Sequence, residues 1–549
     1  MSARRARAGE SEPIAPSPDL ALAREDPRSP GVRAGAWLTL LAVASLATRL
    51  PFLRYPFLNV DEAVHLVGSW ELLRGGRLYV DFADNKPPLV HVFYAVAQIL
   101  FGDGILAVRL LAALALTPLT ALGASAFFGH GRRGQAAALA FIVASAALLA
   151  SDAHAVHCEH VLLLPLAWSM VVLRSPRSMR QAGPLFSAGV LLGLATLAKQ
   201  PAAACLLVPM AGVLQAARPA RPGARVLEYA SRVRRALPLW GALLVGFALP
   251  LLATAALFQR EGTLGSAVFW IWRFNLGHIA NPMPPADMLV RVATMGGLVA
   301  PAAGALLAAA WWGRRRRSSG HRRRLPWLLA IATFFPALLG FRLFGHYFLP
   351  FLFALSLAAA PFLGARRQAR LRGPLVAFGA FAAVVFTVVG RVVYDPARPV
   401  ADASRPEYER IGEAVRNDPS CGGPLFVWGY APAVYAYAAM RPASRFVVPI
   451  DTLTGYLAGN DAAAQGRVDT SARIVGAHWD QLMADLEANR PAHFVDTAPA
   501  DLNRWGRFTL SRFPRLLDLV TRDYHVHAVV DGAVIYRRNE CAPATAAAH

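Results

Sequence analysis

Residues 104–128 read GILAVRLLAALALTPLTALGASAFF, an apolar run that contains one charged side chain, Arg109. A helix of roughly 20 apolar residues is long enough to cross the hydrocarbon core of a bilayer. Similar runs recur throughout the 549 residues, and 55% of the chain is apolar. Because a soluble domain does not need so many uninterrupted apolar stretches, the sequence predicts a polytopic membrane protein that is mostly α-helical.

The basic residues predict how the spans are oriented. Only two of the 56 basic residues are lysines, and the arginines cluster in short loops between apolar runs, as is typical of cytoplasmic loops. The net charge of +22 therefore reflects orientation, and we expect no nucleic-acid binding. If every arginine-rich loop is cytoplasmic, successive spans must cross the membrane in alternating directions. This requires residues 90–101 to form an interfacial helix, and they are in any case too few to span a bilayer. The eleven expected spans are 36–51, 104–128, 135–151, 161–173, 184–198, 201–217, 237–258, 288–312, 326–341, 346–364 and 374–394.

These spans divide the chain into three parts. Residues 1–34 are rich in Arg, Pro and Ser without an apolar run, which predicts a disordered cytoplasmic tail. Residues 35–394 form the transmembrane domain, with a large first outer loop at 52–103. Residues 395–549 alternate strand-like and helix-like segments, which predicts a small extracytoplasmic α/β domain. The strand-like runs are 424–428, 445–449, 493–495 and 526–536.

Several reactive side chains fall on the predicted outer side. Cys421 and Cys541 are in the C-terminal part and are able to pair if that part is extracytoplasmic. Lys86 and Lys199 also lie outside, where the positive-inside rule gives no reason for a basic residue. Lys86 belongs to Asp84-Asn85-Lys86-Pro87-Pro88, and the two prolines would hold it in place. We interpret Lys86 as a phosphate-binding residue, against the alternative of a solvated turn.

The first outer loop also carries candidate catalytic carboxylates. Asp61 and Glu62 follow the first span closely, within Leu58-Asn59-Val60-Asp61-Glu62-Ala63. A carboxylate beside an apolar wall can act as a general base. The alternative is an acidic pair that caps an amphipathic interfacial helix.

The second and fifth outer loops hold further candidates. The second loop packs Asp152, His154, His157, Glu159 and His160 into nine residues, and imidazole with carboxylate suits zinc or manganese. The spacing matches no metalloprotease signature, so a polar re-entrant loop with one functional carboxylate is the favoured alternative. In the fifth loop, cationic side chains at a helix entrance are suited to holding a lipid phosphate, or else serve as interfacial anchors. These side chains are Arg342 and His346.

Together these motifs resemble the polytopic glycosyltransferases of the C-type fold. The resemblance is strongest to bacterial relatives of the dolichyl-phosphate-mannose protein mannosyltransferases, with a relation to the lipid A aminoarabinose transferases. Two departures from the pattern are Asn85, where the aminoarabinose branch has an acidic residue, and His65, where a tyrosine is common. The matching segments are Asp61-Glu62-Ala63, Tyr79-Val80-Asp81, Asn85-Lys86-Pro87-Pro88-Leu89, Thr196-Leu197-Ala198-Lys199-Gln200-Pro201 and Gly345-His346-Tyr347-Phe348-Leu349-Pro350.

The resemblance implies roles for individual residues. Asp61 would be the acceptor-activating base or a metal ligand, and Lys86 would contact the donor phosphate. Glu159 or Asp152 would be the second-loop carboxylate. The full expected set is Asp61, Glu62, Asp84 and Glu159 for catalysis, Lys86, Lys199, Arg342 and His346 for the donor phosphate, and Asp152, His154 and His157 for a divalent metal.

The resemblance also implies a function. We expect a multi-pass plasma-membrane enzyme that transfers a sugar from a polyprenyl-phosphate donor to a lipid, protein or glycan acceptor on the outer face. A transporter is the alternative from a different class, but it would place polar residues and broken helices near mid-membrane. A ligase or polymerase of lipid-linked glycans shares the leaving group and would need a groove for a longer donor.

Overall fold

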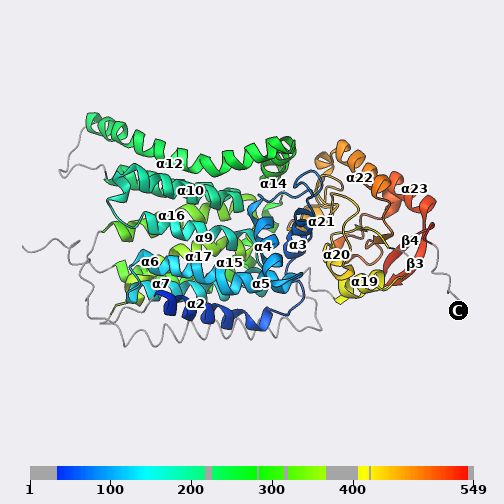
Figure 1. Cartoon of the computed structure of the whole chain (residues 1–549), viewed down its shortest axis with the longest axis horizontal. Helices are drawn as coiled ribbons and strands as arrows, with labels where there is room; N and C mark the ends of the chain where they lie inside the picture. The colour runs from blue at the N-terminus through cyan, green and yellow to red at the C-terminus, as the bar shows by residue number, and fades with distance from the viewer. Residues whose placement is uncertain are drawn as a thin grey trace, which may run out of the picture.

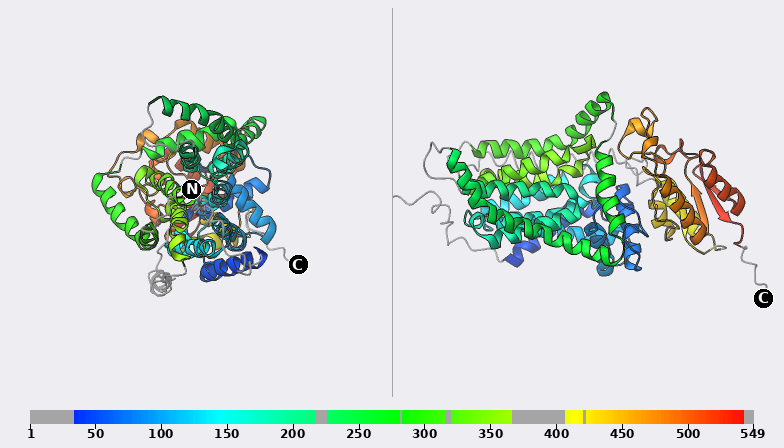
Figure 2. Two further views of the ribbon diagram at one scale, coloured as in Figure 1. Left: turned by 90° about the vertical axis from the view of Figure 1, so that its left-hand side faces the viewer. Right: turned by 90° about the horizontal axis from the view of Figure 1, so that it is seen from above.

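The computed structural model describes residues 34–216, 226–280, 283–314, 320–365, 406–419 and 422–541. These residues form a bundle of long helices and a smaller C-terminal part that contains a sheet (Figure 1). Figure 2 shows the two parts following one another along the long axis of the molecule. The expected span 374–394 and nearly all of the expected tail 1–34 lie outside the described residues.

The bundle confirms the prediction of a polytopic helical membrane protein. Among the described residues, five helical stretches are long and apolar enough to cross a membrane: Gly35–Phe52, Ile105–Phe127, Ser231–Arg260, Pro285–Gly313 and Gly345–Leu363. Shorter apolar helices pack between them. In chain order the bundle helices are α2 (Ala34–Arg49), α5 (Ile105–Leu111), η2 (Ala112–Leu116), α6 (Thr117–Phe127), α7 (Arg132–Ala146), α9 (Cys158–Val172), α10 (Ala182–Ala198), η4 (Gln200–Leu206), α11 (Leu207–Ala216), α12 (Val226–Arg260), α15 (Pro285–Arg314), α16 (His321–Ala337), η7 (Gly345–Phe348) and α17 (Leu349–Leu363).

Small residues bring two of these helices into close contact. Gly189 and Gly193 are four residues apart on α10, and a Cβ at either position would overlap the backbone of α12. Gly246 of α12 in turn approaches the carbonyl oxygen of Phe186 so closely that a Cβ there would overlap it. Since lipid tails are as apolar as leucine, close backbone packing of this kind is a main source of helix association in a membrane.

The segment expected as the first outer loop folds into two short helices at the end of the bundle that faces the C-terminal part (Figure 1). These are α3 (Val60–Leu73) and α4 (Leu89–Phe101). The side chain of Asn59 caps α3 by accepting a hydrogen bond from the Asp61 amide at 2.9 Å. With 13 residues, α4 has the length expected for an interfacial helix rather than a span.

The C-terminal part is an α/β structure around a four-stranded sheet. Its strand order is β1-β2-β4-β3, with β1 and β2 parallel and the other pairs antiparallel. The residues of β1 and β2 are all buried. The main elements are α19 (Pro406–Arg416), β1 (Leu425–Trp428), α20 (Ala433–Ala438), α22 (Gly476–Asn489), β2 (His493–Asp496), α23 (Pro514–Asp523), β3 (Tyr524–Val530) and β4 (Ala533–Arg538).

Two details of the strand prediction were wrong. The run 526–536 is a hairpin, because Asp531 and Gly532 turn the chain in the left-handed region. The run 445–449 is not a strand: its start is held by Arg445, whose guanidinium pairs with Asp485 and whose carbonyl accepts from the Ala83 amide. Arg445 thereby connects the C-terminal part, through Asp485, to the segment before Lys86, through Ala83. Cys541 is disulfide-bonded, and Cys421 lies outside the described residues.

Candidate active site

The centre of the candidate site is the pair formed by Asp61 and Lys86. Asp61 lies in the first turn of α3, and Lys86 precedes the prolines that lead into α4. The Lys86 Nζ is 3.8 Å from the Asp61 Oδ2 and donates to the Asn85 Oδ1 at 3.1 Å. The Tyr79 hydroxyl donates to the Lys86 carbonyl at 2.8 Å. The loop therefore holds the lysine backbone while its ammonium group reaches the carboxylate.

The surroundings keep both members of this pair charged. Burial alone would raise the pKa of Asp61, but the charge of Lys86 and the nearby His65 outweigh it, and the pKa is well below its usual value. Burial opposes the charge of Lys86 as well, yet Asp61 and Asp84 raise the pKa of that ammonium above its ordinary range. A carboxylate with such a low pKa is a weak base until its positive neighbours are compensated.

Two stacked histidines lie beside Asp61. His157 and His346 stack with ring centroids 3.7 Å apart, and the His157 Nδ1 is 3.9 Å from the Asp61 Oδ2. One ligand atom from each of these three residues lies within 4.8 Å of the other two. The two histidines come from loops 189 residues apart in sequence, at the start of α9 and in η7.

The hydrogen bonds of these histidines suit a divalent metal. The His157 Nε2 is 2.7 Å from the Ser151 carbonyl, which accepts its proton and leaves Nδ1 buried without a partner. The His346 Nδ1 is 2.6 Å from the Asp152 Oδ1 and donates to it, which leaves Nε2 for a ligand. Such outer partners fix the tautomer of metal-binding histidines. Burial lowers the pKa of His157 to about 4, so it is neutral and able to bind a metal at neutral pH.

The expected metal residues take different positions around this cluster. His157 belongs to it, and Asp152 supports it from behind His346. His154 is not brought in: its ring stacks on Phe52 with centroids 4.1 Å apart. Two imidazoles with one carboxylate favour zinc and related ions over magnesium.

Glu62 is held in a buried network. Its carboxylate binds Arg109 at 2.6 and 3.1 Å and accepts from the amides of Leu58 at 2.9 Å and Val156 at 3.3 Å. Arg109 also donates to three carbonyls of the segment 52–56. With its oxygens used in this way, Glu62 anchors the backbone beside Asp61. The single charge in the apolar run 104–128 was the sequence signal for this anchor.

Asp84 precedes Lys86 by two residues and supports the same loop. Its Oδ2 is 3.0 Å from the His91 Nε2, and its Oδ1 accepts from the Asn85 amide at 2.7 Å. It thus supports the lysine loop through His91 and the Asn85 amide.

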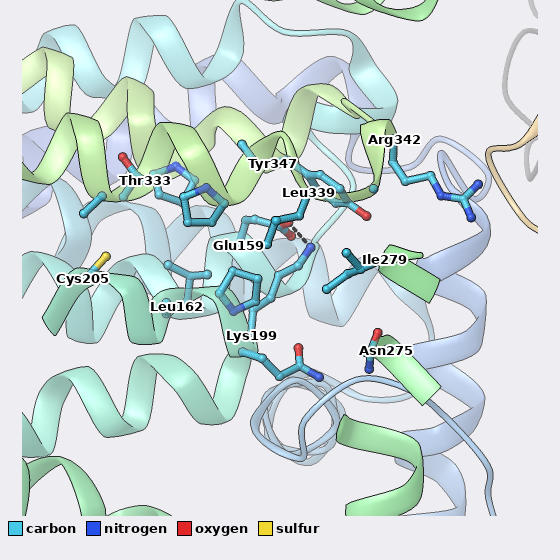
Figure 3. Close-up of a pocket in the computed structure, with 18 of the residues that line it drawn as sticks. Glu159, Leu162, Lys199, Cys205, Asn275, Ile279, Thr333, Leu339, Arg342 and Tyr347 are labelled. Atoms are coloured by element: carbon cyan, nitrogen blue, oxygen red, sulfur yellow. Dashed lines mark hydrogen bonds and ion pairs between the residues drawn. The ribbon is translucent and has the colours of Figure 1, made fainter. Parts of the chain in front are cut away.

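An apolar cavity of about 190 Å³ lies next to this centre (Figure 3). Its walls come from α9, η4, α14 (Asn275–Ile279) and α16, and include Leu162 and Cys205. Lys199 and Glu159 form an ion pair at its polar end, where the Lys199 Nζ lies 3.9 Å from the centre of the Tyr347 ring.

The remaining polar residues of the cavity connect it to the Lys86 loop. Asn275 Nδ2 donates to the Asn85 carbonyl at 2.8 Å, and Gln200 Nε2 approaches the same oxygen at 3.3 Å. Neither amide residue was given a role from the sequence, although Gln200 stands in a matching segment, because a single amide gives no distinctive pattern. Arg342 lines the cavity, but its guanidinium points away from Lys199 and donates to the Ala458 carbonyl of the C-terminal part (Figure 3).

The sequence matches no protein-family model and no curated protein. Among solved structures, ArnT from Cupriavidus metallidurans in the apo state is similar over 92% of this chain and 98% of its own, with a TM-score of 0.53 and 16% identity. ArnT from the same organism bound to undecaprenyl phosphate is similar over 91% of this chain and 97% of its own, with a TM-score of 0.50 and 15% identity. The Archaeoglobus fulgidus oligosaccharyltransferase in complex with Zn and sulfate is similar over 91% of this chain and 73% of its own, with a TM-score of 0.42 and 13% identity.

The likeness to ArnT establishes the fold. It extends over nearly the whole of both chains, so the helical bundle and the C-terminal part belong to one shared architecture. The chain therefore shares the polytopic helical fold of ArnT, in agreement with the membrane fold expected from its sequence.

Proposed function

We propose that this protein is an integral membrane glycosyltransferase that transfers a sugar from a polyprenyl-phosphate donor to an acceptor on the outer face of the plasma membrane. The observation that carries the proposal is an apolar cavity whose polar end holds a lysine, next to the Asp61–Lys86 pair. The fold shared with ArnT, which has been solved with undecaprenyl phosphate, supports the same class of donor.

The cavity suits the two halves of such a donor. Its apolar walls match a polyprenyl chain, and Lys199 at its polar end matches a phosphate. Lys199 is paired with Glu159 and is close enough to Lys86 for the two ammonium groups to interact electrostatically. Positive charge at this place stabilises the phosphate that departs from the anomeric carbon.

The acceptor would be activated by Asp61. Transfer breaks the bond between the anomeric carbon and the phosphate oxygen, while the acceptor hydroxyl forms the new glycosidic bond and gives up its proton. A bound phosphate compensates the charge of Lys86, which raises the pKa of Asp61 and makes it a better proton acceptor. The alternative role of Asp61 is that of a metal ligand: a divalent ion held by Asp61, His157 and His346 would supply positive charge near the phosphate, and Asp61 would then not be the proton acceptor.

Sugar transfer in proteoliposomes tests this function. Radiolabelled polyprenyl-phosphate sugars are supplied to the wild type, to Asp61→Asn and to Lys86→Met, and we expect each variant to lose transfer by at least about 100-fold. Asp81→Asn is the matched control in the same loop, because Asp81 pairs with the exposed Arg77. Full transfer by Asp61→Asn would rule out the mechanism.

A further inference from the structure

Glu159 brings a negative charge to the polar end of the apolar cavity, where the proposed function places a phosphate. It lies in the first turn of α9, and its side chain is buried. Glu159 and Lys199 both line the cavity, and Figure 3 shows their ion pair. Because a carboxylate repels a neighbouring phosphate, Glu159 weakens the binding of an anion that Lys199 favours.

The other lysine of the site also has a carboxylate partner. The Lys86 Nζ lies 3.8 Å from the Asp61 Oδ2, and Lys199 is close enough to Lys86 for their charges to interact. The described residues that line the cavity include one carboxylate, that of Glu159. Each ammonium group is thus paired before any lipid enters, and the positive charge that a phosphate meets is limited.

The proposed transfer changes the charge of the lipid phosphate. The donor is a phosphodiester with one negative charge. When the bond between the anomeric carbon and the phosphate oxygen breaks, its electron pair stays on that oxygen. The acceptor hydroxyl bonds to the carbon and gives its proton to the base of the site. The lipid leaves as a phosphate monoester with about two negative charges at pH 8, so product and donor differ by about one charge.

We propose that Glu159 determines charge specificity at this site: it makes the site favour the singly charged lipid donor over the doubly charged lipid product. Coulomb energy is proportional to charge, so its repulsion acts about twice as strongly on the monoester as on the diester. Lys199 attracts both lipids, while Glu159 limits what the product gains from that attraction. Polyprenyl phosphate is therefore released faster and inhibits less. The inference rests on the proposed function, from which it takes the donor.

Two short-chain lipids test this role on the full-length protein in detergent. Farnesyl phosphate represents the product, and its monomethyl ester represents the singly charged donor. Isothermal titration calorimetry at pH 8 gives Kd for each. In Glu159→Gln, Kd of farnesyl phosphate should fall by at least about 10-fold more than Kd of the ester, because one negative charge nearby is removed. A merely structural role of Glu159 would change the affinity for both lipids alike.

Two variants are the controls. Glu159→Asp keeps the charge and should keep the wild-type ratio of the two Kd values. Asp287→Asn should also keep it, because Asp287 pairs with Arg467 of the C-terminal part and does not line the cavity. Equal changes of both Kd values in Glu159→Gln, or the same ratio in Glu159→Asp as in Glu159→Gln, would overturn the inference and leave the proposed function standing. If neither lipid binds the wild type, the proposed donor site fails and the inference fails with it.

Product inhibition gives a second readout in the sugar-transfer assay. Undecaprenyl phosphate should inhibit Glu159→Gln at a concentration at least about 10-fold lower than it inhibits the wild type. The first turnover of this variant should be slowed less than its steady-state rate, because release of the lipid product is the step that Glu159 assists. Inhibition at the wild-type concentration would contradict the inference.

Discussion

The protonation of Asp61 is set by its neighbours. Burial and positive charge act on this carboxylate in opposite directions, and the charges prevail. The largest of these charges belongs to Lys86, which is also the residue assigned to the donor phosphate. The two roles are linked, because whatever compensates Lys86 also changes the basicity of Asp61.

This link predicts a pH effect. In Lys86→Met the charge that lowers the pKa of Asp61 is lost, so the pKa rises and the acidic limb of the pH–rate profile moves to higher pH. In Lys86→Arg the charge is kept, so the limb stays in place while the rate falls through poorer phosphate geometry. The measurement is the pH dependence of residual sugar transfer in both variants. Identical acidic limbs in Lys86→Met and the wild type would contradict it.

The stacked histidines lead to a prediction about metal content. Protein purified without chelator should contain about one zinc-like ion per chain, and His157→Ala and His346→Ala should each remove most of it. Asp152→Asn should weaken binding by roughly 10–100-fold, because it only orients His346. The measurement is elemental analysis by mass spectrometry. His154→Ala is the control and should retain the ion, since His154 faces Phe52; equal losses in all four variants would argue against the cluster.

At the scale of elements, α10 and α12 depend on glycine. A Cβ at Gly193 would overlap the Phe247 carbonyl and approach the Pro250 ring at 2.6 Å, so the helices must separate to admit it. We predict that Gly193→Ala destabilises the protein by about 1–3 kcal/mol, as for other overpacked sites. Thermal unfolding in detergent measures the effect.

Gly183 on the same helix gives the matched comparison. No atom lies within 4 Å of a Cβ at this position, so Gly183→Ala should be neutral or stabilising, by up to about 1 kcal/mol from helix propensity. If both alanine variants lower the melting temperature equally, close packing is not the cause.

At the scale of the whole molecule, the sequence predicted local features better than contacts between distant segments. Asp61 and Lys86 could be singled out as candidates because they stand in one loop with distinctive neighbours, and the distance of 3.8 Å between Oδ2 and Nζ places their side chains together. The contact between Asp152 and His346 spans 194 residues, and hydropathy does not specify which loops meet. The prediction of a strand at 445–449 was wrong because contacts with distant segments decide its structure. Its apolar residues pack in the core, while Arg445 is held by Asp485 and by Ala83. The boundaries of the three expected parts stay a prediction.

The contact between the C-terminal part and the bundle reaches the apolar cavity lined by Lys199 and Asn275. Arg473 pairs with Asp451 at 2.6 Å within the C-terminal part and donates to the Gly277 carbonyl of α14 at 2.8 Å. Two residues earlier on α14, Asn275 holds the Asn85 carbonyl next to Lys86. The C-terminal part therefore supports Asn275, which holds the loop of Lys86.

We predict that Arg473→Gln loosens this support. Hydrogen exchange should increase in α14 and in the segment around Asn85, and KM for the lipid donor should rise several-fold more than kcat falls, because the chemical groups stay in place. Arg522→Gln is the control, since Arg522 pairs with the adjacent Asp523 on the surface of its own helix. If Arg473→Gln changes exchange only within the C-terminal part, the two parts fold against each other without any coupling to the donor site.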